Sequence, residues 1–195
     1  MTKFLVTLVI LCVSLTLDAQ DSPKGLQVKE KAPAFTAKDQ AGKTISLESQ
    51  LKKGPVVLVF YRGQWCPYCS RQLKKLEDSL SLITAKGATV IAVTPEKTEN
   101  INKTISKTKA SYPILFDEGL KIMKSYDVSY QVSEKTIGKY KGYGIDFVEA
   151  NGTTNGTNLP VPAMYIINKE GIIVFRHFDP DYTKRPSVLE ILKYL

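Results

Sequence analysis

The chain has 195 residues, with 27 Lys and Arg against 19 Asp and Glu, and a formal net charge of +8. This length suits one domain, and 43% hydrophobic residues exclude a disordered or collagen-like chain. Three Cys and one His are too few for a disulfide-dense scaffold and argue against a four-ligand zinc site, so we expect no metal and no other cofactor. The lysines are scattered, which indicates a solvated basic surface rather than a nucleic-acid site.

Residues 1–19 have the pattern of a secretory signal peptide. Lys3 gives a positive start, residues 4–17 are mostly apolar, and Ala19 offers a weak small-residue cleavage site. The apolar stretch is short for a membrane span, and an uncleaved anchor is the alternative. We therefore expect an exported protein, periplasmic or secreted, with one domain over residues 20–195 and no stable membrane insertion after cleavage. Cleavage removes Cys12 and leaves only Cys66 and Cys69.

Hydrophobic patterning in the remainder predicts alternating strands and helices. Short strands are expected at 34–37 and 44–47, and the continuous apolar run at 55–61 is typical of a strand buried on both faces. The further expected elements are an amphipathic helix at 70–86, a strand at 89–93, a polar helix from Thr94-Pro95 to about Lys107, a strand at 112–116, a helix at 118–126, strands at 164–168 and 172–178, and a helix at 187–195. This order predicts an α/β fold with a central mixed β-sheet and helices on both faces.

Residues 137–160 interrupt the alternation. They hold five of the twelve glycines, and residues 151–158 have no apolar side chain, so we expect a long loop or insertion. Interleaved Tyr and Lys can mark nucleic-acid binding, but a flap packed over the sheet edge near the active site fits better. Asn102, Asn151 and Asn155 each lie in an Asn-x-Thr sequon, which matters only in a host that glycosylates secreted proteins.

The segment Trp65-Cys66-Pro67-Tyr68-Cys69 lies between the first buried strand and the first amphipathic helix. A Cys at the start of a helix faces unpaired N–H groups and the positive end of the helix dipole, which lower its pKa. We therefore predict that Cys66 is the attacking thiolate. Pro67 suits the first helical position, and Cys69, one turn later, is within reach as the resolving thiol.

A structural disulfide and half a zinc site account for the cysteine pair less well. A disulfide across four residues would restrict the unfolded chain very little. A zinc site would need more ligands, and His177 is expected to be a surface or packed residue at a strand end. Redox chemistry therefore fits the pair best. Pro162 precedes the strand expected at 164–168, and the sequence alone leaves the bond before it cis or trans.

From about Ala32 onward the chain resembles the thioredoxin superfamily, specifically its AhpC/TSA (redoxin) branch. The resemblance rests on Ala-Pro-Ala-Phe at 32–35, Val-Leu-Val-Phe-Tyr-Arg-Gly at 57–63, Trp-Cys-Pro-Tyr-Cys at 65–69 and Pro-Ala-Met-Tyr-Ile-Ile-Asn at 162–168. It implies a thioredoxin-like three-layer fold and a cis bond before Pro162, facing the cysteines. Val161 would then present its backbone to an extended peptide, with Trp65, Val161 and Pro162 as the docking surface.

Peroxiredoxins of the same branch carry a Pro-x-x-x-Thr-x-x-Cys motif after the first buried strand. In this comparison the family's peroxidatic Cys falls on Cys69, its Thr on Cys66 and its Pro on Arg62, while a peroxide-binding arginine falls on Pro162. Three of the four elements are thus replaced. Arg62 or Arg185 is the candidate cation near the thiolate, and the strand before Cys66 lacks the buried acid that thioredoxins use as a base.

These features predict an exported thiol–disulfide oxidoreductase that cycles between dithiol and disulfide at Cys66 and Cys69. The alternative is a peroxiredoxin-like thiol peroxidase (an antioxidant enzyme) using the same pair, with Cys69 oxidised to sulfenic acid. A non-enzymatic binding module with a structural disulfide is the third hypothesis. Expected partners are protein or small-molecule thiols and disulfides, hydroperoxides under the peroxidase hypothesis, and a thiol reductant, with no nucleic acid.

Overall fold

The central sheet has five strands in a computed structural model that describes residues 22–195; the expected signal segment lies outside these residues. The strand order is β5-β4-β3-β8-β9. β3 is parallel to β4, and β4 to β5, whereas β8 runs antiparallel to both β3 and β9. The predicted mixed sheet is therefore confirmed, with strands β3 (Val56–Phe60), β4 (Thr89–Thr94), β5 (Ile114–Phe116), β8 (Ala163–Ile167) and β9 (Ile173–Phe178).

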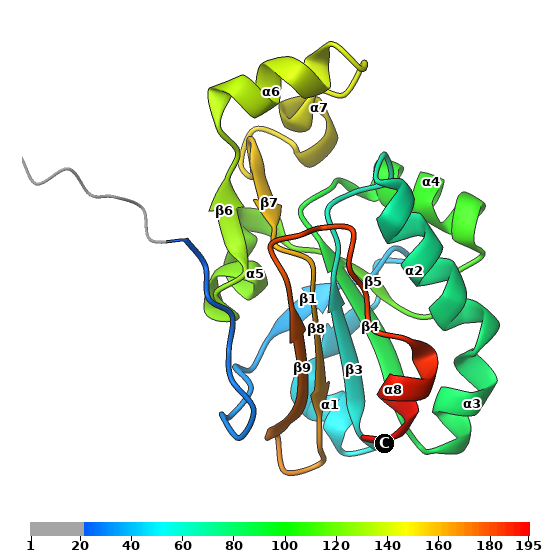
Figure 1. Cartoon of the computed structure of the whole chain (residues 1–195). Coiled ribbons are helices and arrows are strands. Elements are labelled where there is room, and N and C mark those ends of the chain that lie inside the picture. Colours follow the sequence, from blue (N-terminus) through cyan, green and yellow to red (C-terminus); the bar gives the residue numbers. More distant parts are fainter. Residues whose placement is uncertain (1–21) are drawn as a thin grey trace, which may run out of the picture.

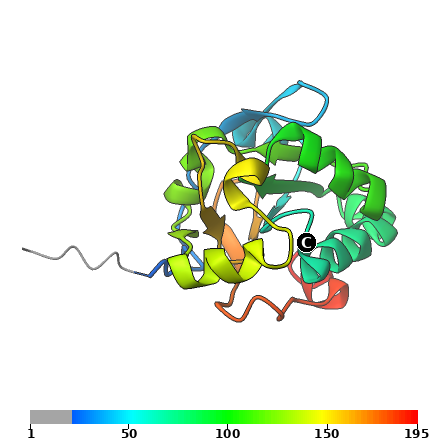
Figure 2. The same cartoon turned by 90° about the horizontal axis from the view of Figure 1, so that it is seen from above.

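Helices cover both faces of this sheet (Figures 1 and 2). Val57 and Val59 of β3 face a layer formed by α2 (Pro67–Asp78), α3 (Leu80–Ala85), α4 (Thr98–Thr108) and α8 (Val188–Leu192). Leu58 and Phe60 face the opposite layer, formed by the hairpin β1 (Thr36–Lys38) and β2 (Thr44–Ser46), α1 (Leu47–Leu51), the 3-10 helix η1 (Glu118–Leu120) and α5 (Lys121–Ser125). Every residue of β3 is buried, as the two-sided apolar run predicts, and the three-layer fold is confirmed.

Several helices differ from the predicted ones, including the helix expected at 118–126, which is η1 and α5 with Leu120 in a left-handed conformation between them. The expected helix at 70–86 is α2 and α3, because Ser79, with φ −112° and ψ 10°, leaves the helical conformation between them. The helix expected to open at Thr94-Pro95 begins at Thr98, after Lys97 in an extended conformation. The five-residue α1 was not predicted, since so short a helix has little periodicity; the Ser46 hydroxyl caps it by accepting from the N–H of Ser49.

The segment at 129–160, called the insertion below, agrees with the first of the two alternatives expected for 137–160, an insertion or a loop, and it contains regular secondary structure. β6 (Ser129–Gln131) pairs antiparallel with β7 (Asn158–Pro160), and α6 (Glu134–Lys141) and α7 (Phe147–Asn151) lie between them. The insertion stands above the end of the sheet at which α2 begins (Figure 1).

Buried Asn side chains hold the polar end of the insertion in place. The amide of Asn155 donates to the carbonyls of Pro95 and Asp117, and that of Asn151 donates to the carbonyl of Asn158. Both Asn side chains are fully buried. These amides add to a small apolar cluster of Val132, Phe147 and Leu159, whose members lie far apart in the insertion.

Over residues 22–195, none of the helices has both the length and the apolar character needed to cross a bilayer.

Candidate active site

The two cysteines lie at the start of α2, as predicted. Cys66 caps the helix with φ −88° and ψ 109°, and Pro67 occupies the first helical position. The N–H of Cys69 donates to Cys66 Sγ over 3.4 Å, and the two Sγ atoms are 2.6 Å apart. Both cysteines are free and almost completely buried, with exposed fractions of 1% and 0%. The pair can therefore close to a disulfide without rearrangement of the helix.

The electrostatic surroundings of the two sulfurs differ. Burial raises the pKa of Cys69, but the Cys66 thiol, the Arg185 guanidinium, and the backbone N–H and charge of Arg62 together lower it to about 6. The hydrogen bond to Cys69, followed by burial, raises the pKa of Cys66. The thiolate predicted at Cys66 stays a prediction: the N–H of Cys69 donates to Cys66 Sγ, whereas the cations of the site lower the pKa of Cys69.

Arg185 places a cation against the Cys69 sulfur. Its Nη2 lies 3.6 Å from Cys69 Sγ, and its Nε donates to Gln72 Oε1 over 2.8 Å. Nη1 donates to the carbonyls of Tyr182 and Lys184. The Gln72 side chain on the helix and the loop backbone both bind the guanidinium, which is therefore held against the sulfur with no acidic partner among residues 22–195.

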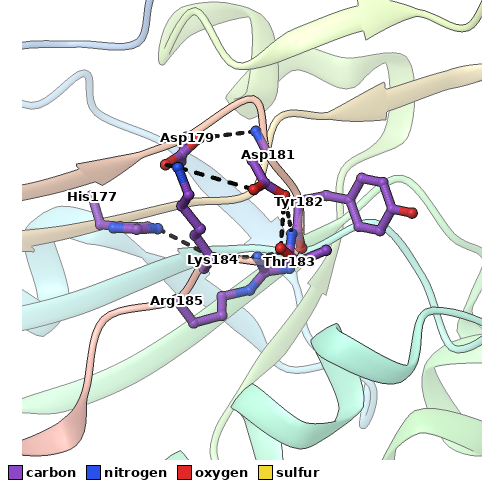
Figure 3. Close-up of polar contacts among 7 residues, drawn as sticks. All are labelled: His177, Asp179, Asp181, Tyr182, Thr183, Lys184 and Arg185. Carbon is purple, nitrogen blue, oxygen red and sulfur yellow. Dashed lines mark hydrogen bonds and ion pairs between the residues drawn. The ribbon is translucent and has the colours of Figure 1, made fainter.

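The loop that carries Arg185 is stabilised by its own polar side chains (Figure 3). Asp179 accepts from the N–H of Asp181 and pairs with Lys184 Nζ at 3.3 Å. Asp181 in turn accepts from the N–H and hydroxyl of Thr183. These turns fix a loop between β9 and α8 that contains no regular secondary structure.

Arg62 forms the other cationic side of the site. It is 3% exposed, and its guanidinium carbon lies 4.2 Å from the ring centroid of Tyr182 and 4.8 Å from that of Trp65. Its Nη2 donates to the Tyr140 hydroxyl over 2.6 Å. The Trp65 ring also lies 5.2 Å from that of Tyr140 and 5.3 Å from that of Phe147. The insertion therefore covers the cysteine pair, and the expected position of the flap near the site is confirmed.

Val161 and Pro162 line a separate groove. It has a volume of about 530 Å³, and its walls include Tyr130 and Tyr182. Tyr182 also contacts Arg62, so the groove adjoins the cysteine site. The N–H of Val161 donates to the carbonyl of Val128 over 2.8 Å, so it is already engaged by the chain itself.

The cis bond that the family resemblance implied before Pro162 is not found. The peptide bonds of residues 22–195 contain no cis bond. A trans bond is the intrinsically favoured isomer, and here residues 161 and 162 form a short extended link between β7 and β8.

His177 lies in β9 and does not belong to the site. Its Nε2 is 3.4 Å from the carbonyl oxygen of Lys184, and burial lowers its pKa. Across the described residues, no three His, Cys, Asp or Glu side chains gather in a way that could hold a metal ion.

Sequence patterns did not identify several residues of the site. Tyr140 and Phe147 come from the insertion, whose polarity suggested a loop. Gln72 lies among helix residues with nothing to distinguish it, and Tyr182 lies in a loop. Glu96 lies where the sequence predicts the opening of a helix, yet it is a fully buried carboxyl behind the site. Only tertiary structure brings these residues to the cysteines.

Solved structures with the same fold include redox proteins of two kinds. A mutant of Peroxiredoxin 6 from Arenicola marina aligns with a TM-score of 0.68 and 18% identity, over 86% of this chain and 71% of that one. The thioredoxin domain of a thiol-disulfide oxidoreductase from Bacteroides vulgatus aligns with a TM-score of 0.55 and 20% identity, over 81% and 93% of the two chains. At these identities the likeness shows the fold alone.

Sequence comparison identifies the family. The chloroplastic Peroxiredoxin Q of Suaeda salsa is 38% identical over 96 residues, which cover 49% of this chain and 44% of the relative. The chain thus spans about half the length of the curated relatives it matches. The AhpC/TSA family as a whole matches residues 28–176, which include both cysteines and the complete central sheet apart from the end of β9. The chain therefore belongs to the AhpC/TSA family.

Proposed function

We propose that the protein is a thiol-dependent peroxidase in which Cys69 reacts with a hydroperoxide and Cys66 resolves the product. The Cys69 thiolate attacks the terminal oxygen, the O–O bond breaks, and Cys69 becomes a sulfenic acid while an alkoxide leaves and takes up a proton. The Cys66 thiol then attacks Cys69 Sγ, forming the disulfide and releasing water. Two molecules of an external thiol reduce the disulfide and become a disulfide themselves.

The observation that carries this proposal is the contact between Arg185 and Cys69. The guanidinium stabilises the thiolate and lies where negative charge develops on the leaving oxygen. A pocket of about 270 Å³, lined by Tyr68, Gln72 and Arg185 among others, gives a small molecule access to this guanidinium. Both sulfurs are buried, which suits a small oxidant better than a protein disulfide. The site therefore favours peroxide reduction over the disulfide exchange that the sequence favoured.

Thiol–disulfide exchange with a protein is the second candidate. The groove along Val161 and Pro162 supports it, because an extended peptide can lie there beside Tyr130 and Tyr182. The fold shared with a thiol-disulfide oxidoreductase agrees with this candidate but does not favour it, since peroxiredoxins share the same fold.

The experiment compares two oxidants on the reduced protein. Hydrogen peroxide and a small disulfide are mixed separately with the protein, and the fluorescence of Trp65 and the remaining thiols are followed in time. We expect oxidation by peroxide far faster than for free cysteine at the same pH, and no such reaction in Cys69→Ser. Peroxide rates equal to those of free cysteine, together with rapid disulfide exchange, would replace the peroxidase proposal by the second candidate.

We further propose export, with removal of residues 1–19 and folding of residues 20–195 outside the cytoplasm. The pattern of Lys3, the apolar stretch at 4–17 and Ala19 supports this proposal. Expression in a bacterial host with N-terminal sequencing of the periplasmic fraction tests it. A mature chain beginning at Gln20 is expected, and an intact cytoplasmic chain would contradict it.

A further inference from the structure

The buried carboxyl of Glu96 has no role in the chemistry described so far. Glu96 follows β4 and is 0% exposed. Its Oε2 accepts from the N–H of Gln64 over 2.7 Å, in the segment that leads from β3 to the cysteines. Its Oε1 is also buried and has no hydrogen-bond partner among the described residues. A carboxyl group left half-unsatisfied in the interior is costly, and such a group demands a functional explanation.

The unsatisfied oxygen of Glu96 faces the cysteine segment. A Cβ placed on Gly63 would lie 2.6 Å from Glu96 Oε1 and 2.5 Å from Trp65 Nε1, an indole donor that is likewise buried without a partner in the described chain. The two unpartnered atoms are thus close neighbours across Gly63, immediately before Cys66. Only glycine leaves room for this approach.

The charge on Cys69 affects the pKa of Glu96. Burial is the main cause that raises the pKa of Glu96, to about 8, and the charge on Cys69 raises it further. The N–H of Gln64 and the ammonium groups of Lys107 and Lys103 on α4 lower it. The pKa of the Tyr61 phenol is raised by burial, next by the charge on Glu96, and to a smaller extent by the charge on Cys69.

The proposed reaction needs one proton that the cysteine pair does not supply. The reduced pair holds a single proton, on Cys66, and this proton leaves with hydroxide as water. The alkoxide released in the first step needs another. At the same moment Cys69 loses its negative charge, so one of the two causes that raise the pKa of Glu96 is removed while burial remains.

We propose that Glu96 donates this second proton, so that oxidation of the pair transfers one negative charge from Cys69 to the Glu96 carboxylate. The inference rests on the reaction given under Proposed function, but it holds for any two-electron oxidant of the pair. The reduced state is Cys69 thiolate, Cys66 thiol and Glu96 carboxylic acid. With a hydroperoxide these give the disulfide, Glu96 carboxylate, an alcohol and water. Reduction by two external thiols restores thiolate and thiol and releases one proton, which returns to Glu96.

Proton counting tests this inference directly. The reduced protein at pH 7 is oxidised by one equivalent of hydrogen peroxide in weakly buffered solution, and proton uptake is read from an indicator dye. We expect almost no uptake by the wild type and uptake of about one proton per disulfide by Glu96→Gln, which keeps an acceptor for Gln64. Glu96→Asp is expected to restore the wild-type result. Thr104→Val is the matched control, because Thr104 Oγ1 is also buried without a partner in the described chain but carries no proton of this kind.

The wild-type measurement alone can overturn the inference even if a variant fails to fold, because uptake of about one proton per disulfide would exclude a proton donor in the protein. Repeating the measurement with dithiodipyridine, whose released thiopyridones hold their own protons at pH 7, separates the two proposals. Oxidation by dithiodipyridine without proton uptake, alongside inertness to peroxide, would leave the Glu96 inference standing and refute the peroxidase. Rapid oxidation by both reagents with uptake of about one proton per disulfide would refute the Glu96 inference and leave the peroxidase proposal standing.

Discussion

The hydroxyl of Tyr140 accepts a hydrogen bond of 2.6 Å from Arg62, a residue 78 positions earlier in the chain. This bond joins the insertion to the segment that leads into the cysteines. Because Arg62 is buried and its Nε has no partner in the described chain, the Tyr140 hydroxyl contributes to the satisfaction of a charge that water does not reach.

Tyr140→Phe should therefore destabilise the protein. Loss of one hydrogen bond to a buried charge is expected to lower the free energy of unfolding by about 1.5–3 kcal/mol. Urea unfolding measures the change. Tyr143→Phe is the control, since Tyr143 is 69% exposed and should tolerate loss of its hydroxyl. Equal stability of both variants would show that the bond contributes nothing to the fold.

Arg185→Met should raise the pKa of Cys69 and slow its oxidation. Removal of the cation 3.6 Å from the sulfur withdraws a charge that favours the thiolate. We expect the midpoint of the pH profile for iodoacetamide alkylation to rise from near 6 by about one unit or more. Arg71→Met removes the same charge from a residue that stacks on Tyr68, and its profile should match the wild type. A profile unchanged by Arg185→Met would exclude Arg185 as the stabilising cation.

The two cysteines should give different products when replaced singly. In Cys66→Ser, peroxide should leave a sulfenic acid at Cys69 that dimedone captures and mass spectrometry locates. In Cys69→Ser, the remaining Cys66 should react slowly, because burial, which raises its pKa, is retained and no sulfur lies beside Arg185. Dimedone capture at Cys66 in the second variant, and none at Cys69 in the first, would reverse the assignment.

The free energy of unfolding should depend on pH through two groups, Cys69 and Glu96, whose contributions change in opposite directions. The pKa of Cys69 falls from 9.0 to about 6 on folding, so its contribution to stability grows as the pH rises through this range. The pKa of Glu96 rises from 4.5 to about 8, so its contribution is lost as the pH rises over that interval. Between pH 6 and 8 the two slopes oppose each other, and the reduced wild type should be nearly insensitive to pH.

Glu96→Gln removes the contribution to the free energy of unfolding that decreases as the pH rises. Its free energy of unfolding should rise between pH 6 and 8 by up to about 1.4 kcal/mol per pH unit. Urea titrations at several pH values, under a thiol-free reductant, measure this dependence. If the free energy of unfolding of the variant depends on pH as little as that of the wild type, the carboxyl and the thiolate do not hold opposite protonation states in the folded protein.

The sequence predicted the strand, the cysteine segment and the helix that form the site, because local patterns determine these elements. A two-sided apolar strand followed by Cys, Pro and an amphipathic helix places Cys66 at a helix start in nearly any packing. The sequence predicted a long loop or insertion at 137–160 but not its helices and strands, because α6 buries none of its residues and the apolar cluster of Val132, Phe147 and Leu159 is small. Patterns of hydrophobicity carry little signal for such a unit.

The assignment of charge within the cysteine pair could not come from the sequence either. The start of the helix could be predicted from the sequence, and it favours a thiolate at Cys66. Arg185 lies in a loop 116 residues from Cys69. Its contact with the sulfur depends on Gln72 and on the turn around Asp181. A balance between neighbours so distant in the chain is a property of the folded state alone.

The buried amides of the insertion restrict how this protein can be made. Asn151 and Asn155 both lie in glycosylation sequons, yet their amide nitrogens donate to backbone carbonyls in the interior. A sugar attached to either before folding would occupy the space that the Asn must fill, so a glycosylated insertion could not close over the cysteines. Asn102 lies on the exposed side of α4 and could carry a glycan without this conflict. Production in a eukaryotic secretory pathway should therefore yield active protein only from chains that escape modification at the two buried sequons.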